Sequence, residues 1–97
     1  MKYEILSTQI FDDWLDGLKD IRAKAKLNTR ISRTQTGNFG DWKTEAGEIR
    51  AMRIDYGPGY RIYYVMRGNK IVFLLCGGDK HTQTTDIKKA MKLAKEV

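Results

Sequence analysis

The chain has 97 residues, of which 41% are hydrophobic and 31% charged, a balance typical of a soluble globular protein rather than a disordered one. This length predicts one domain, residues 1–97, because a second would lack a core of its own. We expect a cytoplasmic protein, since no apolar run approaches the ~20 residues of a membrane span and no signal-peptide pattern opens the chain. The single cysteine and single histidine argue against a disulfide or a Cys/His metal site.

The formal net charge of +6 is unevenly distributed along the chain. Residues 1–20 carry two lysines against five acidic residues, whereas residues 21–97 carry sixteen cations against seven acidic residues. A basic body of this kind indicates a polyanionic target, with a generic basic surface kept for solubility as the alternative.

The first third of the chain predicts one strand and two helices. Residues 2–6 alternate apolar and polar side chains, which favours a short strand at the edge of a sheet. Ser7 or Thr8 can cap a helix whose apolar residues follow helical spacing, and a second helix is predicted from about residue 21 to residue 34. The apolar positions expected to pack on the sheet are Phe11, Trp14, Leu15, Leu18 and Ile21.

The second predicted helix carries a row of cations on one face. These residues are spaced at i, i+4, i+8 and i+11, which places them along a single stripe: Arg22, Lys26, Arg30 and Arg33. Such a stripe can follow the phosphates of a nucleic acid. A merely solvated face is the alternative.

Residues 37–47 are rich in glycine, and residues 41–45 are expected to be a loop that leads into a three-strand meander over residues 49–76. The turns of the meander are Gly57-Pro58-Gly59 and Gly68-Asn69, the latter suited to a two-residue hairpin. Pairing Arg67 with Lys70 places Arg61 opposite Cys76 on the third strand. Pairing Tyr56 with Tyr60 likewise places Arg61 opposite Asp55 and Tyr63 opposite Arg53.

Alternation then separates a core face from a polar face of the meander. The core face carries Met52, Ile54, Ile62, Tyr64 and Met66. The third strand, residues 71–76, is apolar on both sides, so we expect an interior strand that includes Val72 and Leu74. A last helix, capped by Thr84 or Thr85, is predicted to bury Ile87, Ala90, Met91 and Ala94.

The polar face provides the candidate site. It combines Arg53, Arg61 and Tyr63 with Lys80 and His81 beyond the third strand, and Lys43 arrives on the preceding loop. Cations can hold and neutralise a phosphate during attack by a neighbouring 2′-hydroxyl, Tyr63 can stack on a base, and Lys80 or His81 can move a proton. The chain contains no phosphate loop, dinucleotide motif or zinc-protease motif, so no cofactor is expected.

Four stretches, taken in order, resemble the RelE/ParE superfamily of toxins, especially the HigB-like, phage Gp49-like addiction-module killer proteins. They are FDDWLDGLKD (residues 11–20), GNFGDWK (residues 37–43), RIDYGPGYRIYY (residues 53–64) and LLCGGDKHTQTTDI (residues 74–87). The resemblance implies an α+β fold: an N-terminal helical hairpin packed on a small, mainly antiparallel sheet, with a C-terminal helix.

The resemblance also implies a function. It predicts the toxin of a type II toxin–antitoxin module, a metal-independent mRNA endoribonuclease (mRNA interferase) that inhibits translation on the ribosome. The expected partners are a cognate antitoxin, the ribosome and mRNA, with DNA contacted only through the antitoxin complex. Two alternatives remain: a ParE-like inhibitor of DNA gyrase without nuclease activity, and a noncatalytic protein that binds RNA or the ribosome.

The resemblance assigns the basic positions of the family to Arg53, Arg61 and Lys80, and we add His81 as a catalytic candidate. Lys43, Tyr63, Arg22, Lys26 and Arg30 are the candidate substrate-binding residues. Asp86 stands near the position where RelE has a tyrosine, which leaves the general base open.

Overall fold

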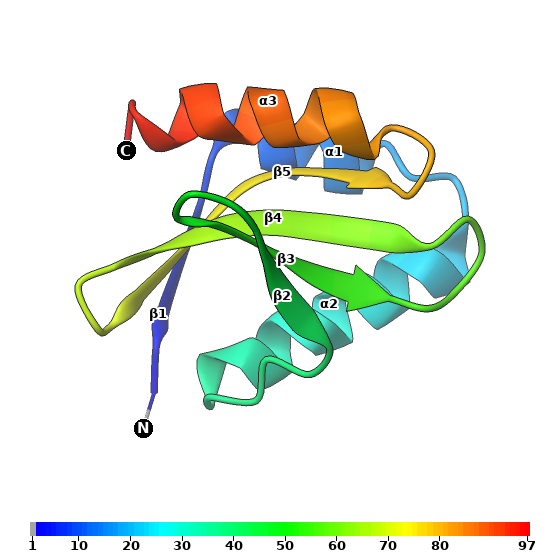
Figure 1. The fold of residues 1–97 in the computed structure, drawn as a ribbon. Helices are drawn as coiled ribbons and strands as arrows, with labels where there is room; N and C mark the ends of the chain where they lie inside the picture. The colour runs from blue at the N-terminus through cyan, green and yellow to red at the C-terminus, as the bar shows by residue number, and fades with distance from the viewer. Residues whose placement is uncertain (1) are drawn as a thin grey trace.

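The computed structural model describes residues 2–97, which form a five-stranded mixed sheet with helices on both faces (Figure 1). The strand order is β1-β5-β4-β3-β2; β1 is parallel to β5, and the other neighbouring pairs are antiparallel. The predicted α+β class is confirmed. In chain order the elements are β1 (Glu4–Ser7), α1 (Gln9–Asp16), α2 (Ile21–Gln35), β2 (Trp42–Ala46), β3 (Ile49–Ile54), β4 (Tyr60–Arg67), β5 (Ile71–Asp79) and α3 (Gln83–Ala94).

The sheet separates two apolar cores. Helices α1 and α2 lie on one face, where Phe11 and Leu27 pack against the side chains predicted for the core face of the meander. Helix α3 covers the opposite face and packs Ala90, Leu93 and Ala94 on the sheet. Strand β5 contributes to both cores, so the prediction of an interior strand with Val72 and Leu74 is confirmed.

The first two helices begin at side-chain caps. The Thr8 hydroxyl accepts a 3.0 Å hydrogen bond from the Phe11 N–H, and Asp20 accepts bonds from the first N–H groups of α2. Both helices therefore start directly after a polar capping residue that is followed by apolar residues at helical spacing. However, α1 and α2 each pack on the sheet and do not form a clear helical hairpin, so that part of the prediction is not supported.

The predicted register between β4 and β5 is wrong by two residues at the site. The last pair before the turn is Arg67 with Ile71, not Lys70, which shifts the ladder by one. A β-bulge between Tyr63 and Tyr64 shifts it by one more, so Arg61 lies opposite Gly78 instead of Cys76. The sequence around the bulge is apolar on both faces, and therefore no polar alternation marks it.

The predicted register between β3 and β4 is also wrong. A compact turn over residues 55–59, with Gly57 and Gly59 at φ of 59° and 82°, makes Ile54 with Tyr60 the last pair. Arg61 consequently lies opposite Arg53, not Asp55, and Tyr63 lies opposite Ala51. The two arginines therefore share one face of neighbouring strands.

Four further expectations are corrected. Ile21, which was expected to pack on the sheet, is 83% exposed. Residues 42–46 are the edge strand β2, hydrogen-bonded to β3, and not a loop. In α3 the side chain of Met91 is 45% exposed, and Leu93 is buried in its place. The helix also begins earlier than expected, at Gln83, because Thr82 and not Thr84 or Thr85 occupies the N-cap position; Asp86 lies in its first turn as predicted.

The Gly77-Gly78 pair lets one side chain approach β5 closely from each face, Trp14 on one and Asp86 on the other. A Cβ on Gly77 would lie 2.2 Å from the Trp14 ring, and a Cβ on Gly78 would lie 1.8 Å from the Asp86 carboxylate. Glycine is required here for close approach, which fixes α1 and the start of α3 against the strand end. Within residues 2–97, no helix combines the length and apolarity needed to cross a membrane.

Candidate functional site

A cleft of about 350 Å³ lies where β3 ends and β4 begins, beside the strand end of β5. Three of the predicted catalytic residues line it: Arg53 from β3, Arg61 from β4 and Lys80 from the turn after β5. The remaining lining residues are Asp41, Ile54, Asp55, Gly57, Pro58 and Gly59. The structure thus brings together cations that are up to 27 positions apart in the sequence.

Arg53 is held by an acidic neighbour, Asp41, which immediately precedes β2. Its Nη2 lies 2.7 Å from Asp41 Oδ1, and its Nε lies 3.3 Å from the same oxygen. This hydrogen bond raises the pKa of Arg53 and lowers the pKa of Asp41, so both groups are charged near neutral pH. Asp41 thereby orients Arg53 and offsets the repulsion between the two opposed arginines.

Of the two arginines, Arg61 has the less complete set of hydrogen bonds. Its Nε is buried and has no hydrogen-bond partner among residues 2–97, although the residue itself is only half-buried. An unpaired buried donor is costly, and a bound anion oxygen is the kind of partner that would satisfy it. The lining carries three cations against two carboxylates, so the cleft has a net charge of +1.

The other predicted basic residues do not all line this cleft. They are Lys80, His81 and Lys43. The Lys80 side chain packs by the turn before β4, since a Cβ on Gly59 would lie 3.5 Å from Lys80 Cδ. His81 is exposed on the following turn, where its N–H donates to Asp79 Oδ1, and it is not among the lining residues. Lys43 projects from β2, 3.5 Å from Glu45 Oε1, and also lies outside the lining.

The proposed base-stacking role of Tyr63 is wrong. Tyr63 is 0% exposed and packs in the core beneath α3, because the face of the sheet that carries Arg61 is covered from this position onward. Its hydroxyl is buried without a hydrogen-bond partner among residues 2–97, and burial raises the pKa of this hydroxyl above its usual value. RNA cannot reach the ring without opening the core.

Arg30 has a structural role that differs from the expected contact with phosphate. Its guanidinium donates hydrogen bonds to three backbone carbonyls: Phe39 at 3.0 Å, Arg53 at 2.9 Å and Asp41 at 2.6 Å. Burial lowers its pKa from the ordinary value. The donors that would bind a phosphate are thus engaged in joining α2 to β3 and to the segment that precedes β2.

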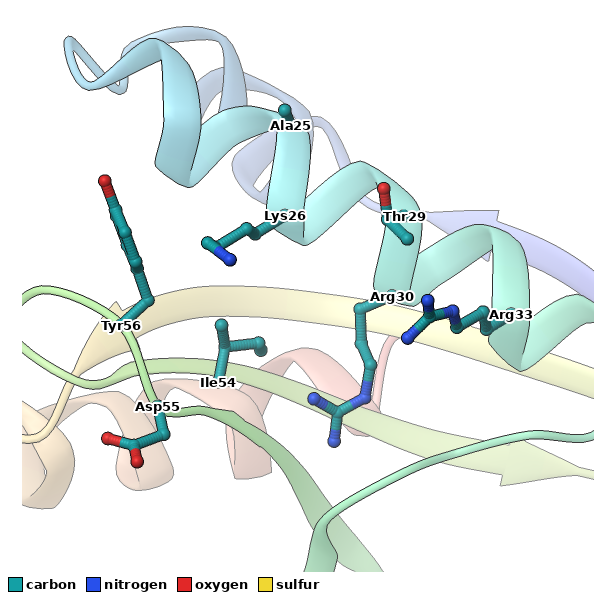
Figure 2. A pocket seen from close by; sticks show the side chains of 8 residues that line it. All are labelled: Ala25, Lys26, Thr29, Arg30, Arg33, Ile54, Asp55 and Tyr56. Atoms are coloured by element: carbon teal, nitrogen blue, oxygen red, sulfur yellow. The ribbon is translucent and has the colours of Figure 1, made fainter.

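Two other cations of the stripe line a second groove, of about 370 Å³, between α2 and the end of β3 (Figure 2). Lys26 and Arg33 reach it from the helix, and Lys26 Nζ lies 5.1 Å from the centre of the Tyr56 ring. Arg22 is exposed on the same helix but lines neither hollow.

Sequence reasoning did not select Asp41 and Tyr56, which line the cleft and the groove respectively. Asp41 stood in a segment expected to be a loop, and its ion pair with Arg53 depends on a strand pairing that alternation alone did not reveal. Tyr56 directly precedes the Gly-Pro-Gly turn, which marked it only as a turn residue. In residues 2–97, no three His, Cys, Asp or Glu side chains gather closely enough to hold a metal ion.

Comparisons with known proteins bear on the family and the fold. An uncharacterised protein of Haemophilus influenzae is 53% identical over 97 residues, which span 100% of this chain and 98% of that protein. The solution structure of a conserved hypothetical protein from Helicobacter pylori has 18% identity and a TM-score of 0.53; the match covers 84% of this chain and 97% of that one, and it shows a shared fold alone. The model of the family described as "Phage derived protein Gp49-like (DUF891)" matches residues 13–97. The chain therefore belongs to the Gp49-like family of phage-derived proteins, a family of RelE-like and toxin-like proteins.

Proposed function

We propose that this protein is the toxin of a type II toxin–antitoxin module and cleaves mRNA on the ribosome. The observation that carries the proposal is the pairing of Arg53 with Arg61 on adjacent strands. Lys80 lines the same cleft from the turn after β5. Like charges placed opposite each other destabilise a sheet, and Asp41 hydrogen-bonds Arg53 but not Arg61, so an anionic ligand beside Arg61 would offset the remaining repulsion. Membership of a toxin-like family supports the same reading.

In the proposed reaction, the 2′-hydroxyl of one nucleotide attacks the adjacent phosphorus and the 5′-oxygen leaves. Arg53 and Arg61 hold the phosphate and stabilise the negative charge that develops on its oxygens; the Nε of Arg61 has no hydrogen-bond partner among residues 2–97 and is free to donate to it. Lys80 neutralises charge or supplies a proton to the leaving oxygen. The proton of the 2′-hydroxyl goes to His81 or to a group of the ribosome. A cognate antitoxin would keep the toxin inactive by covering this face.

Primer extension on mRNA after brief induction tests the proposal. Wild-type protein should produce new 5′ ends within translated regions, and Arg61→Ala and Lys80→Ala should each reduce cleavage by about 10²- to 10³-fold, the usual loss for one preorganised charge contact. Lys92→Ala removes an exposed cation from the outer face of α3 and should cleave normally. Intact mRNA together with poisoned gyrase would instead identify a gyrase inhibitor.

His81→Ser addresses the proton acceptor separately. A large loss of cleavage that is relieved at higher pH is expected if the imidazole takes the proton. Cleavage at the wild-type rate would remove His81 from the reaction and assign this step to the ribosome or to solvent.

A further inference from the structure

We infer that the groove between α2 and Tyr56 is a second RNA subsite, which binds the nucleotide next to the one held in the Arg53–Arg61 cleft. This inference rests on the proposed function for the identity of its ligand, single-stranded RNA. It goes beyond that function because it assigns a binding role to Tyr56 and Arg33, which lie outside the cleft.

The two hollows are neighbours. Ile54 and Asp55 line both of them, so an RNA strand that passes over the end of β3 would lead from the cleft to the groove. Arg30 fixes this boundary, because its guanidinium binds the carbonyls of Arg53 and Asp41 on the cleft side while its helix forms the wall of the groove. The relative position of the two hollows is therefore set by hydrogen bonds between elements.

The groove combines the chemical features that a nucleotide requires. Figure 2 shows the Tyr56 ring standing at one end and the Lys26 and Arg33 side chains reaching in from α2, with Ile54 as an apolar surface between the two walls. Lys26 and Arg33 are separated by seven residues, or about 10 Å along the helix. Aromatic rings bind bases of any sequence by stacking, and flanking cations follow the phosphates.

The contact between Lys26 and Tyr56 indicates how the groove would open. The ammonium lies over the ring at 5.1 Å, a cation–π contact at an exposed position that contributes little. A base can take the place of the ammonium on the ring while Lys26 turns to a phosphate. In Figure 2 the Asp55 carboxylate points away from α2, and its single negative charge is outnumbered by the three cations that line the groove, Lys26, Arg30 and Arg33.

Binding of short, single-stranded 2′-O-methyl RNA, which lacks the nucleophilic hydroxyl, tests the inference by fluorescence anisotropy at fixed salt. Tyr56→Leu should weaken binding by about 5- to 150-fold, the range for loss of one stacking side chain, whereas Tyr56→Phe should bind as the wild type does. Arg33→Gln should weaken binding and lower its salt dependence by about one counterion. The matched control Lys92→Gln removes one charge elsewhere and should leave affinity within about 2-fold.

The outcomes separate this inference from the proposed cleavage. Circular dichroism first establishes that Tyr56→Leu and Arg33→Gln are folded. If both variants then bind RNA normally, the groove is not an RNA subsite, even if the wild-type protein cleaves mRNA. Loss of RNA binding in these variants supports the role of the groove as an RNA subsite, even if the wild-type protein does not cleave mRNA. Binding of a poly-glutamate peptide that depends on Tyr56, with no such dependence for RNA, would assign the groove to a protein partner and overturn the inference.

Discussion

The guanidinium of Arg30 donates a 2.9 Å hydrogen bond to the backbone carbonyl of Arg53, which joins the middle of α2 to the strand that carries the candidate site. The same guanidinium also bonds the carbonyls of Phe39 and Asp41, and a Cβ on Gly40 would lie 2.6 Å from its Nε. One side chain thus fixes the approach of the chain to β2. The geometry of the cleft depends on a residue that does not line it.

Arg30→Ala should therefore destabilise the protein. Three carbonyls lose a charged donor, and we expect the free energy of unfolding to fall by about 2–4 kcal/mol, since hydrogen bonds to charged groups contribute about 1.5–3 kcal/mol each and water replaces part of the loss. Urea denaturation followed by circular dichroism measures this change. Arg22→Ala, on the exposed face of the same helix, should change stability by no more than about 0.5 kcal/mol. Equal stability of the two variants would show that the Arg30 bonds contribute nothing.

Gly77→Ala should destabilise the protein by about 1–3 kcal/mol, because the new methyl group would overlap the Trp14 ring and force α1 away from β5. Thermal or urea unfolding gives the loss. The double variant Gly77→Ala/Trp14→Leu removes the overlapping ring, so its loss should be smaller than the sum of the two single losses. Strict additivity would contradict the proposed overlap.

Tyr63→Phe should leave the fold intact and change stability by no more than about 1 kcal/mol, in either direction. The hydroxyl is buried without a hydrogen-bond partner among residues 2–97, so deleting it removes a desolvated group rather than a hydrogen bond. Since the ring lies beneath α3, the variant should also cleave mRNA as the wild type does. A large fall in cleavage with unchanged stability would restore Tyr63 to the substrate-binding residues.

Cys76 should be inert in the folded protein. Burial raises the pKa of its thiol from 9.0 to about 12, and Sγ lies 3.5 Å from the Asp86 carbonyl oxygen. A thiol-reactive dye at pH 8 should label the unfolded chain rapidly and the native chain only at the rate of unfolding.

The same shift predicts a pH dependence. Because the folded state holds the thiol proton more tightly than the unfolded state, this contribution to stability is complete below pH 9.0 and is lost as the pH rises toward about 12. Cys76→Ala should have a shallower alkaline decline, which unfolding at a series of pH values measures. The decline will not vanish, since burial also raises the pKa of Tyr64 from 10.0 to about 12.

The sequence by itself determined most element types, with β2 as the exception, and the two-sided core. Helical spacing and a capping threonine predicted the first helix, and the apolar run of residues 71–76 predicted an interior strand, because burial on both faces leaves no place for polar side chains. Composition and residue types likewise pointed to basic residues at the ends of β3, β4 and β5. These features are local, since each depends on the chemistry and order of neighbouring residues.

The tertiary structure alone decided which of these residues meet. A shift of one or two positions in pairing changes every partner across a ladder. The sequence marks neither the bulge opposite Tyr63 nor the length of the turn before Tyr60. For that reason the sequence left Arg61 opposite Asp55, whereas packing places it opposite Arg53. Coverage by α3 then buries Tyr63, and the three carbonyls bound by Arg30 come from chain segments that only the folded sheet brings together.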